Sequence, residues 1–207
     1  LNMANTHLEL NEYEPALSIL QRLLRRRPDY SHGAFVLGNC LRDVGRPEQA
    51  ISAYNLCLEY DGKSCDALNN QGLAYGALGN QHKARDCYLL ALSIDPTFRP
   101  ARQNYAQWLI LAKRHEEALL EFQRLAVDAS TSTERVAAYQ GQVACLLELS
   151  RYQDALALAD AEPIEYLRLV KRLHVLPVLY QSTAEIVEVR QRFTDDLARL
   201  QSSLDVA

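Results

Sequence analysis

The side chains best suited to binding in this sequence are asparagines that recur at one interval. Asn2, Asn70 and Asn104 are separated by multiples of 34 residues, and only Val36 interrupts their column. One helical turn further along the same face, more carboxamides follow at Asn5, Asn39 and Gln107. A carboxamide carries two N–H donors and a carbonyl acceptor, so it can bond both polar groups of a peptide unit. The pattern predicts amides that bind an extended polypeptide by its backbone, or that only bond neighbouring helices across a solvated groove.

Other residue groups give weaker indications of chemistry. Gly72, Gly76 and Gly79 do not belong to a G-x-x-x-x-G-K-[ST] phosphate loop. His115 lacks the second histidine of a zinc-protease motif, and the other histidines have no metal-ligand spacing. The five cysteines form no C-x-x-C pair and are typical of small buried apolar residues. We therefore expect no catalytic residue, no metal and no cofactor in this chain.

Composition and charge restrict the partners. Lys and Arg number 22 against 26 Asp and Glu, so the net charge of −4 gives no positive field for nucleic acid. No apolar run approaches the roughly 20 residues of a membrane helix, and the first residues do not form a signal peptide. These patterns predict a cytoplasmic protein without membrane contact. The basic run Arg25-Arg26-Arg27 is typical of a solvated helix end, with contact to an acidic partner as the alternative.

The elements that position these residues follow a 34-residue repeat. One column holds only alanine, at Ala16, Ala50, Ala84 and Ala118. Four residues after each alanine comes a large side chain, at Leu20, Tyr54, Tyr88 and Phe122. Upstream of the alanines a second column holds very small residues, at Ala4, Gly38, Gly72 and Ala106. Because larger side chains would push apart two helices that cross closely, these columns predict the crossing points of helical hairpins.

The sequence also predicts the turns of these hairpins. The types that tolerate positive φ stand between the two helices of the first three units, at Asn11, Gly45 and Gly79, while Lys113 takes this place in the fourth. Second helices should end before the residues Pro28, Gly62, Pro96 and Ser130.

These residues resemble the tetratricopeptide repeat (TPR). The match is carried by Leu37-Gly38, Ala50 and Tyr54, and again by Gly72, Tyr75, Ala84, Tyr88 and Pro96. The resemblance implies an all-α, right-handed solenoid of about five helical hairpins, whose first helices line a concave groove. The units are expected at residues 1–30, 31–64, 65–98, 99–132 and 134–163. The fifth is displaced, since Ala155 follows Ala118 by 37 residues, after a Ser/Thr-rich loop at 129–133.

The repeat pattern stops after Pro163. Residues 164–207 are expected to form a C-terminal extension, with a capping helix and then a long amphipathic helix. One face of the second helix carries an apolar stripe of Ile186, Val189, Phe193, Leu197, Leu200 and Leu204. This stripe either folds back on the preceding helices or forms an interface with another copy or an adjoining catalytic domain.

Two features resemble one group of TPR enzymes. The segment from Leu176 to Ser182 and the helix after it look like the junction in bacterial SPINDLY-type relatives of O-GlcNAc transferase, where a glycosyltransferase domain follows. The asparagine column resembles the ladder that holds substrate peptides in those enzymes; by this resemblance Asn2, Asn70 and Asn104 carry over and Val36 does not. The carboxylate clamp of heat-shock adaptors needs Lys and Arg, but its places here hold His32, Asp66, Asn69, Gln103 and Gln140.

The sequence therefore predicts a protein–protein interaction module, not an enzyme. The expected peptide-binding residues are Asn2, Asn5, Phe35, Val36, Asn39, Asn70, Asn104 and Gln107. Among these, the apolar Phe35 and Val36 would receive ligand side chains. Two alternatives are the substrate-recognition arm of a SPINDLY-like peptide O-glycosyltransferase and an oligomerisation scaffold acting through the C-terminal helix. Because the chain begins inside a first helix and without Met, we expect it to be a piece of a longer protein.

Overall fold

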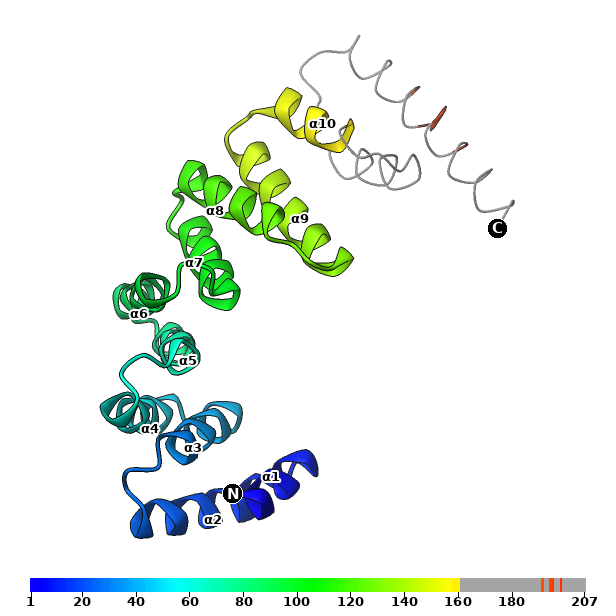
Figure 1. Cartoon of the computed structure of the whole chain (residues 1–207). Coiled ribbons are helices and arrows are strands. Elements are labelled where there is room, and N and C mark those ends of the chain that lie inside the picture. Colours follow the sequence, from blue (N-terminus) through cyan, green and yellow to red (C-terminus); the bar gives the residue numbers. More distant parts are fainter. Residues whose placement is uncertain (161–190, 192–193, 196–197, 199–207) are drawn as a thin grey trace. The chain divides into compact units, whose positions relative to one another are not determined.

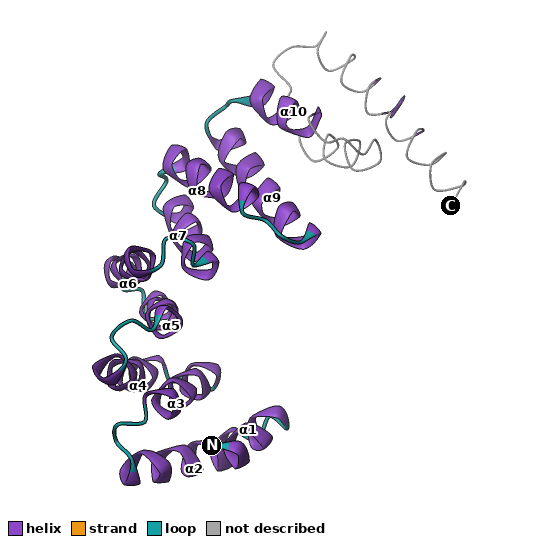
Figure 2. Cartoon of the chain, viewed as in Figure 1, coloured by secondary structure: helices purple, strands orange, loops and turns teal. Residues whose placement is uncertain are grey.

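A computed structural model describes residues 1–160, 191, 194, 195 and 198 of the chain. In this part the regular elements are α-helices joined by short turns (Figures 1 and 2). Their bounds are α1 (Asn2–Glu9), α2 (Tyr13–Arg26), α3 (Ser31–Asp43), α4 (Pro47–Tyr60), α5 (Cys65–Ala77), α6 (Gln81–Ile94), α7 (Arg99–Leu111), α8 (His115–Val127), α9 (Ser132–Glu148) and α10 (Tyr152–Asp160). The helical hairpins of the predicted all-α TPR fold are confirmed.

The contacts divide the chain into two compact units, residues 1–108 and 109–207, and α7 contributes to both. In the first unit α1 packs on α2, α3 on α4 and α5 on α6, while α2 also packs on α3 and α4 on α5. The first helices α3 and α5 also touch directly. In the second unit α9 packs on both α8 and α10. Each of these hairpins is therefore held by the packing of its own two helices and by packing on a neighbouring hairpin.

The turns inside the hairpins have the predicted backbone conformation. Gly45 and Gly79 have φ of 77° and 75°, and Asn11 has φ of 59°. Lys113 also adopts the left-handed conformation, with φ of 58°, although its side chain does not favour it. Ser150 has φ of 57° and follows Lys113 by the same 37 residues that separate Ala118 from Ala155. The displaced fifth unit therefore keeps the turn of the others.

The helix ends follow the same logic. Second helices α2 and α6 end at Arg26 and Ile94, two residues before Pro28 and Pro96, as predicted. The loop predicted at 129–133 is shorter in the structure, because α9 already begins at Ser132. Thr131 accepts a hydrogen bond from the backbone N–H of Glu134, whose carboxylate accepts one from the Thr131 N–H, so the two form a capping box.

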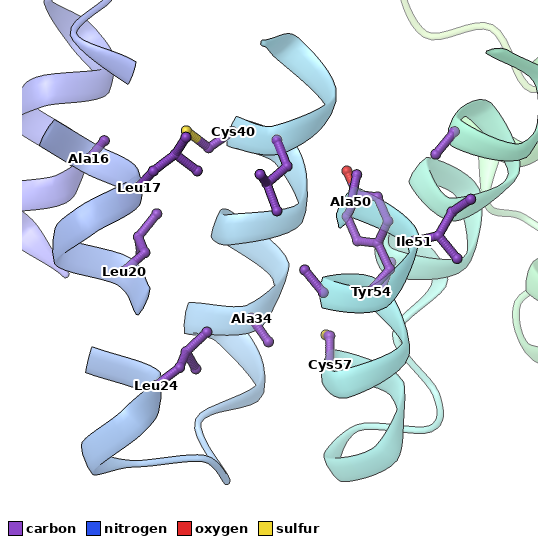
Figure 3. Close-up of a cluster of buried hydrophobic side chains, with 14 of the residues drawn as sticks. Ala16, Leu17, Leu20, Leu24, Ala34, Cys40, Ala50, Ile51, Tyr54 and Cys57 are labelled. Atoms are coloured by element: carbon purple, nitrogen blue, oxygen red, sulfur yellow. The ribbon is translucent and has the colours of Figure 1, made fainter. Parts of the chain in front are cut away.

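The small-residue columns lie in the core, as predicted. The alanine column is buried, with exposures of 0 to 1 % at Ala16, Ala50, Ala84, Ala118 and Ala155. Aromatic rings from the second helices lie against the glycines of the first, Tyr54 on Gly38 and Tyr88 on Gly72. Figure 3 shows Tyr54 beside Ala50 and Ile51 within the buried cluster of the first unit. The missing side chain at each glycine therefore makes the space that an aromatic ring fills.

The predicted C-terminal features lie outside the described residues. This holds for the capping helix at 164–176 and for every residue of the apolar stripe, from Ile186 to Leu204. Within the described part, no helix is both long and apolar enough to span a bilayer.

Two glycines of one helix give a matched test of this packing. A Cβ added to Gly72 would lie 2.5 Å from Tyr88 Cε1, whereas one added to Gly76 meets nothing within 4 Å. Both changes to alanine gain about 0.5–1 kcal/mol of helix propensity, but overpacking costs about 1–3 kcal/mol. We expect Gly76→Ala to raise the free energy of unfolding and Gly72→Ala to lower it, as measured by urea denaturation. Equal effects of the two substitutions would contradict the packing described here.

Candidate functional site

The repeat places carboxamides at matching positions on neighbouring first helices. Asn70 on α5 and Asn104 on α7 stand one period apart, and Asn69 precedes Asn70 by one residue. Asn39 lies one turn beyond Val36, the residue that occupies their column on α3. Because α3 packs directly on α5, side chains of these two helices come within hydrogen-bonding distance.

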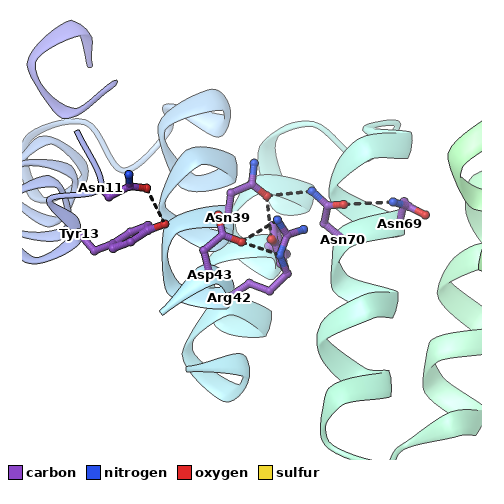
Figure 4. A network of polar contacts seen from close by, with 8 residues as sticks. Asn11, Tyr13, Asn39, Arg42, Asp43, Asn69 and Asn70 are labelled. Carbon is purple, nitrogen blue, oxygen red and sulfur yellow. Dashed lines mark hydrogen bonds and ion pairs between the residues drawn. The ribbon is translucent and has the colours of Figure 1, made fainter. Parts of the chain in front are cut away.

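These side chains form one connected chain of hydrogen bonds. Asn104 Nδ2 donates to Asn69 Oδ1 at 2.8 Å, and Asn69 Nδ2 donates to Asn70 Oδ1 at 3.1 Å. Asn70 Nδ2 then donates to Asn39 Oδ1 at 2.8 Å, and the Tyr54 hydroxyl donates to the same oxygen at 2.8 Å. Figure 4 shows the middle of this network, from Asn39 across to Asn69. We call these four asparagines, Asn39, Asn69, Asn70 and Asn104, the amide chain; it links α3, α5 and α7.

The amide chain has a direction and unused capacity. Asn104, Asn69 and Asn70 each donate to the next amide in the direction of Asn39, and hydrogen bonds in such a chain strengthen one another. Asn39 Oδ1 accepts two bonds, whereas Asn39 Nδ2 has no partner among the described residues. At the other end, Asn104 Oδ1 likewise accepts no bond from the described part of the chain. The α3 end therefore offers donors to a ligand, and the α7 end offers an acceptor.

Exposure separates structural from available amides. Asn69 is 6 % exposed, and both its Nδ2 and its Oδ1 form hydrogen bonds within the amide chain. Asn39, Asn70 and Asn104 are only half-buried, so each presents part of its carboxamide to solvent. The amides thus do bond neighbouring helices, which was one interpretation of the sequence, while three of them keep capacity for a ligand.

The structure does not join the other predicted site residues to this network. Asn2 is exposed and Asn5 half-buried on α1, and Gln107 is exposed on α7; none bonds to the amide chain among the described contacts. Phe35 and Val36 on α3 are half-buried against the core of the first unit. Of the eight predicted residues, the structure therefore connects three directly, and it adds Asn69.

Aromatic rings lie beside the α3 end of the amide chain. The rings of His32 and Phe35 are stacked, with centroids 6.3 Å apart and planes 25° apart. Phe35 also contacts Tyr54, whose centroid is 6.3 Å away. Tyr30 meets His32 edge-on at 6.2 Å, and the Arg27 guanidinium lies over the Tyr30 ring at 5.4 Å. Since Tyr54 bonds Asn39, the rings and the amides form a continuous set of contacts.

A second set of amides lies away from this network. Gln71, 5 % exposed, donates from Nε2 to Asn55 Oδ1 on α4 at 2.6 Å and accepts from Cys87 Sγ on α6 at 3.4 Å. In the second unit, Gln142 donates to the backbone carbonyl of Phe122. Sequence reasoning did not identify these bonds or the role of Asn69. Three consecutive amides at 69–71, within an otherwise apolar helix, are the signal that could have found them.

Burial controls the titratable groups of the core. It raises the pKa of the Tyr54 phenol to about 12, above the ordinary value of 10.0. Burial also raises the pKa of the Cys40, Cys87 and Cys145 thiols to about 11. These thiols stay protonated at neutral pH and lack the thiolate that a nucleophile needs. In the described residues, no three His, Cys, Asp or Glu side chains gather as a metal site.

The basic run lies at a helix end, as its sequence predicts. Arg25 and Arg26 are exposed in the last turn of α2, where their charge complements the helix dipole. Arg27 follows α2 and lies 3.9 Å from the Asp29 carboxylate.

Helical hairpins that recur every 34 residues and pack on one another are typical of all-α solenoid proteins. Residues 1–62 and 65–98 match family models described as tetratricopeptide repeat. These two segments of the chain are therefore tetratricopeptide repeats.

Two curated proteins are similar to parts of this chain. Tetratricopeptide repeat protein 14 of Mus musculus is 39% identical over 67 residues, covering 32% of this chain and 9% of that protein. The probable UDP-N-acetylglucosamine–peptide N-acetylglucosaminyltransferase SPINDLY of Hordeum vulgare is 35% identical over 103 residues, covering 50% of this chain and 11% of that protein. The chain thus spans about a tenth of the length of either relative.

Solved structures share the fold at low sequence identity. The crystal structure of MamA superimposes with a TM-score of 0.70 and 16% identity, covering 83% of this chain and 95% of that one. Pseudomonas aeruginosa PilF superimposes with a TM-score of 0.69 and 16% identity, covering 100% of this chain and 90% of that one. At this identity the likeness shows the fold alone.

The Tyr54 hydroxyl offers a test of the amide chain. Tyr54→Phe removes a hydrogen bond to Asn39 and should lower the free energy of unfolding at pH 7 by about 1 kcal/mol. Since the pKa of Tyr54 is raised to about 12, the contribution of the neutral phenol is complete below pH 10 and is lost as pH rises toward 12. The variant should therefore lose less stability over this interval than the wild type in urea denaturation.

Tyr88 provides the matched control, because it packs on Gly72 one period later and has no side-chain hydrogen bond among the described contacts. Tyr88→Phe should change the free energy of unfolding at pH 7 by less than about 0.5 kcal/mol. If both tyrosine variants lose the same stability, the Tyr54 hydroxyl is not a member of the network.

Proposed function

We propose that this protein is a non-catalytic interaction module that binds an extended segment of another polypeptide along the first helices α3, α5 and α7. TPR modules generally act as protein–protein interaction scaffolds, and the amide chain supplies the specific surface here. The observation that carries the proposal is the unused hydrogen-bonding capacity of Asn39, Asn70 and Asn104. These three half-buried amides are held in orientation by the bonds of the amide chain, and Asn39 also by the Tyr54 hydroxyl.

The chemistry of these amides suits a peptide backbone. Asn39 can donate to a ligand carbonyl, and Asn104 can accept from a ligand N–H, while Asn70 retains one N–H and one lone pair. Packed helices lie about 8–10 Å apart, and an extended chain covers about 3.3 Å per residue. One step from helix to helix therefore matches roughly three ligand residues. Because every peptide unit carries the same two groups, such binding tolerates many ligand sequences.

The described residues also support binding in preference to catalysis. Their buried thiols are protonated at neutral pH, and the polar groups of the amide chain are neutral amides, which neither donate nor remove a proton in a reaction. We therefore assign this chain recognition only.

A second candidate function is the substrate-recognition arm of a peptide O-glycosyltransferase. It is favoured by the similarity to SPINDLY over 103 residues, half of this chain. In that case the amide chain would hold substrate protein for a catalytic domain located elsewhere in a longer polypeptide. The test is the mass of the endogenous protein, detected with an antibody against this chain. A mass that leaves room for several hundred further residues favours the arm, and a mass near 23.4 kDa excludes it.

The amide chain can be tested with peptides selected on the wild-type protein. The probe is a displayed library of random peptides about a dozen residues long, enough to span α3 to α7. The double variant Asn70→Ala with Asn104→Ala should weaken binding of the selected peptides several-fold or more, since each hydrogen bond contributes about 0.5–1.5 kcal/mol. The measurement is fluorescence anisotropy, with helicity compared by circular dichroism.

Asn55→Ala is the matched control. It removes an interhelical amide bond, to Gln71, that is not part of the amide chain. It should therefore reduce stability without changing peptide affinity. The proposal is wrong if the control and the double variant bind the selected peptides equally well.

A further inference from the structure

We propose that the α3 end of this surface is an apolar subsite, formed by His32, Phe35 and Val36, that receives one apolar side chain of the bound peptide. The inference rests on the proposed function, since it assigns a sequence preference to the same surface. It predicts a ligand that is sequence-tolerant along α5 and α7 and selective opposite α3.

The repeat shows that α3 differs from its neighbours at equivalent positions. The column of Asn70 and Asn104 holds Val36 on α3. The preceding column holds Asn69 and Gln103 on α5 and α7, but Phe35 on α3. Two carboxamides are thus replaced by two apolar side chains on one helix, next to helices that keep them. A peptide backbone at α3 would meet apolar surface where it meets amides on α5 and α7.

Contacts in the structure hold this surface in one arrangement. Phe35 contacts two rings: the buried Tyr54 ring, tilted against it at 6.3 Å, and the His32 ring, stacked on it at 6.3 Å. Tyr54 is in turn fixed by its bond to Asn39 and by its contact with Gly38. The apolar side chains are therefore preorganised, which reduces the entropy lost when a ligand side chain packs on them.

The exposure of these residues favours an apolar ligand group. Phe35 and Val36 are only half-buried, and His32 is exposed, so the free protein leaves part of this apolar surface in contact with water. Covering it with an apolar side chain removes both surfaces from water, whereas a charged group would lose hydration on contact with these apolar side chains. Aromatic and aliphatic side chains such as Phe, Tyr, Leu or Ile are thus the expected occupants.

The amide chain fixes where that side chain stands in the peptide. Asn39 lies one helical turn beyond Val36 on α3 and offers two N–H donors to the peptide. Asn70 holds the peptide on α5, one helix away. The apolar residue should therefore stand about three residues from the peptide unit that Asn70 bonds.

The experiment uses the full chain and the displayed random library described above. Sequencing of the retained peptides should show strong enrichment of apolar residues at one position and weak preference at the others. The best peptide and its variant with alanine at that position are then measured by fluorescence anisotropy. Alanine should weaken binding to the wild-type protein about tenfold, the effect of uncovering most of one apolar side chain.

Two protein variants locate the preference. His32→Ala removes an exposed ring and Val36→Asn restores the carboxamide of the neighbouring repeats, so neither disturbs the buried Tyr54. Each should reduce the difference between the two peptides to less than about threefold, through a loss of affinity for the peptide with the apolar residue. Thermal unfolding followed by circular dichroism verifies that both variants fold.

The outcomes distinguish the subsite from the function on which it rests. Loss of binding in the Asn70→Ala, Asn104→Ala variant without any apolar preference supports the amide chain and overturns the subsite. Enrichment of acidic residues in place of apolar ones also overturns it, and would indicate contact of the ligand with Arg25-Arg26-Arg27. If the wild-type protein retains no peptide at all, both the proposed function and the subsite are wrong.

Discussion

The contact on which the other features depend is the aromatic ring of a second helix lying on a glycine of the first. Tyr54 on Gly38 and Tyr88 on Gly72 bring the two helices of a hairpin close enough to bury the alanine column between them. Tyr54 has a second consequence, because its hydroxyl reaches across the hairpin to Asn39. The packing of the core thereby fixes the orientation of the first amide at the candidate site.

The amide chain contributes to stability with the same groups that the proposed function assigns to recognition. A buried carboxamide without partners would cost free energy, so Asn69 uses both of its polar atoms on its neighbours. The half-buried members of the chain use only part of their capacity and leave the remainder to solvent or ligand. This arrangement explains why poor helix formers stand in the middle of these helices: they orient one another across three repeats. In the proposed function, the same orientation prepares them to bind a peptide.

Much of the fold could be predicted because the repeat forces identical packing problems to recur. The small-residue columns, the helix ends near proline and the turns at Asn11, Gly45 and Gly79 all follow from sterics that act within a few residues. The turn at Ser150 was not predicted, since neither its side chain nor the 34-residue register points to it. Its conformation follows from the hairpin, which needs a left-handed residue there whatever the side chain.

The site was less predictable because hydrogen bonds between helices depend on side-chain reach as well as on register. Asn2 shares the column of Asn70 and Asn104 but forms no bond with them among the described residues, since Val36 occupies the intervening place on α3. Asn39 and Asn69 stand in different columns and yet complete the network. Asn39 lies one turn beyond the column on α3 and accepts from Asn70, while Asn69 lies one residue before it on α5 and bonds both Asn70 and Asn104. A column shows which face residues share, whereas the bonding partners emerge only from the packed helices.

The most direct measurement of the central claim is a backbone-ester scan of a selected peptide. Each ester replaces one peptide N–H by oxygen and leaves the side chains unchanged, so it removes a single donor to the protein. If the amides recognise the backbone, esters at positions about three residues apart should weaken binding several-fold, and the Asn104→Ala variant should lose sensitivity to one of them. Equal affinity of every ester peptide, with binding governed by side chains alone, would contradict it.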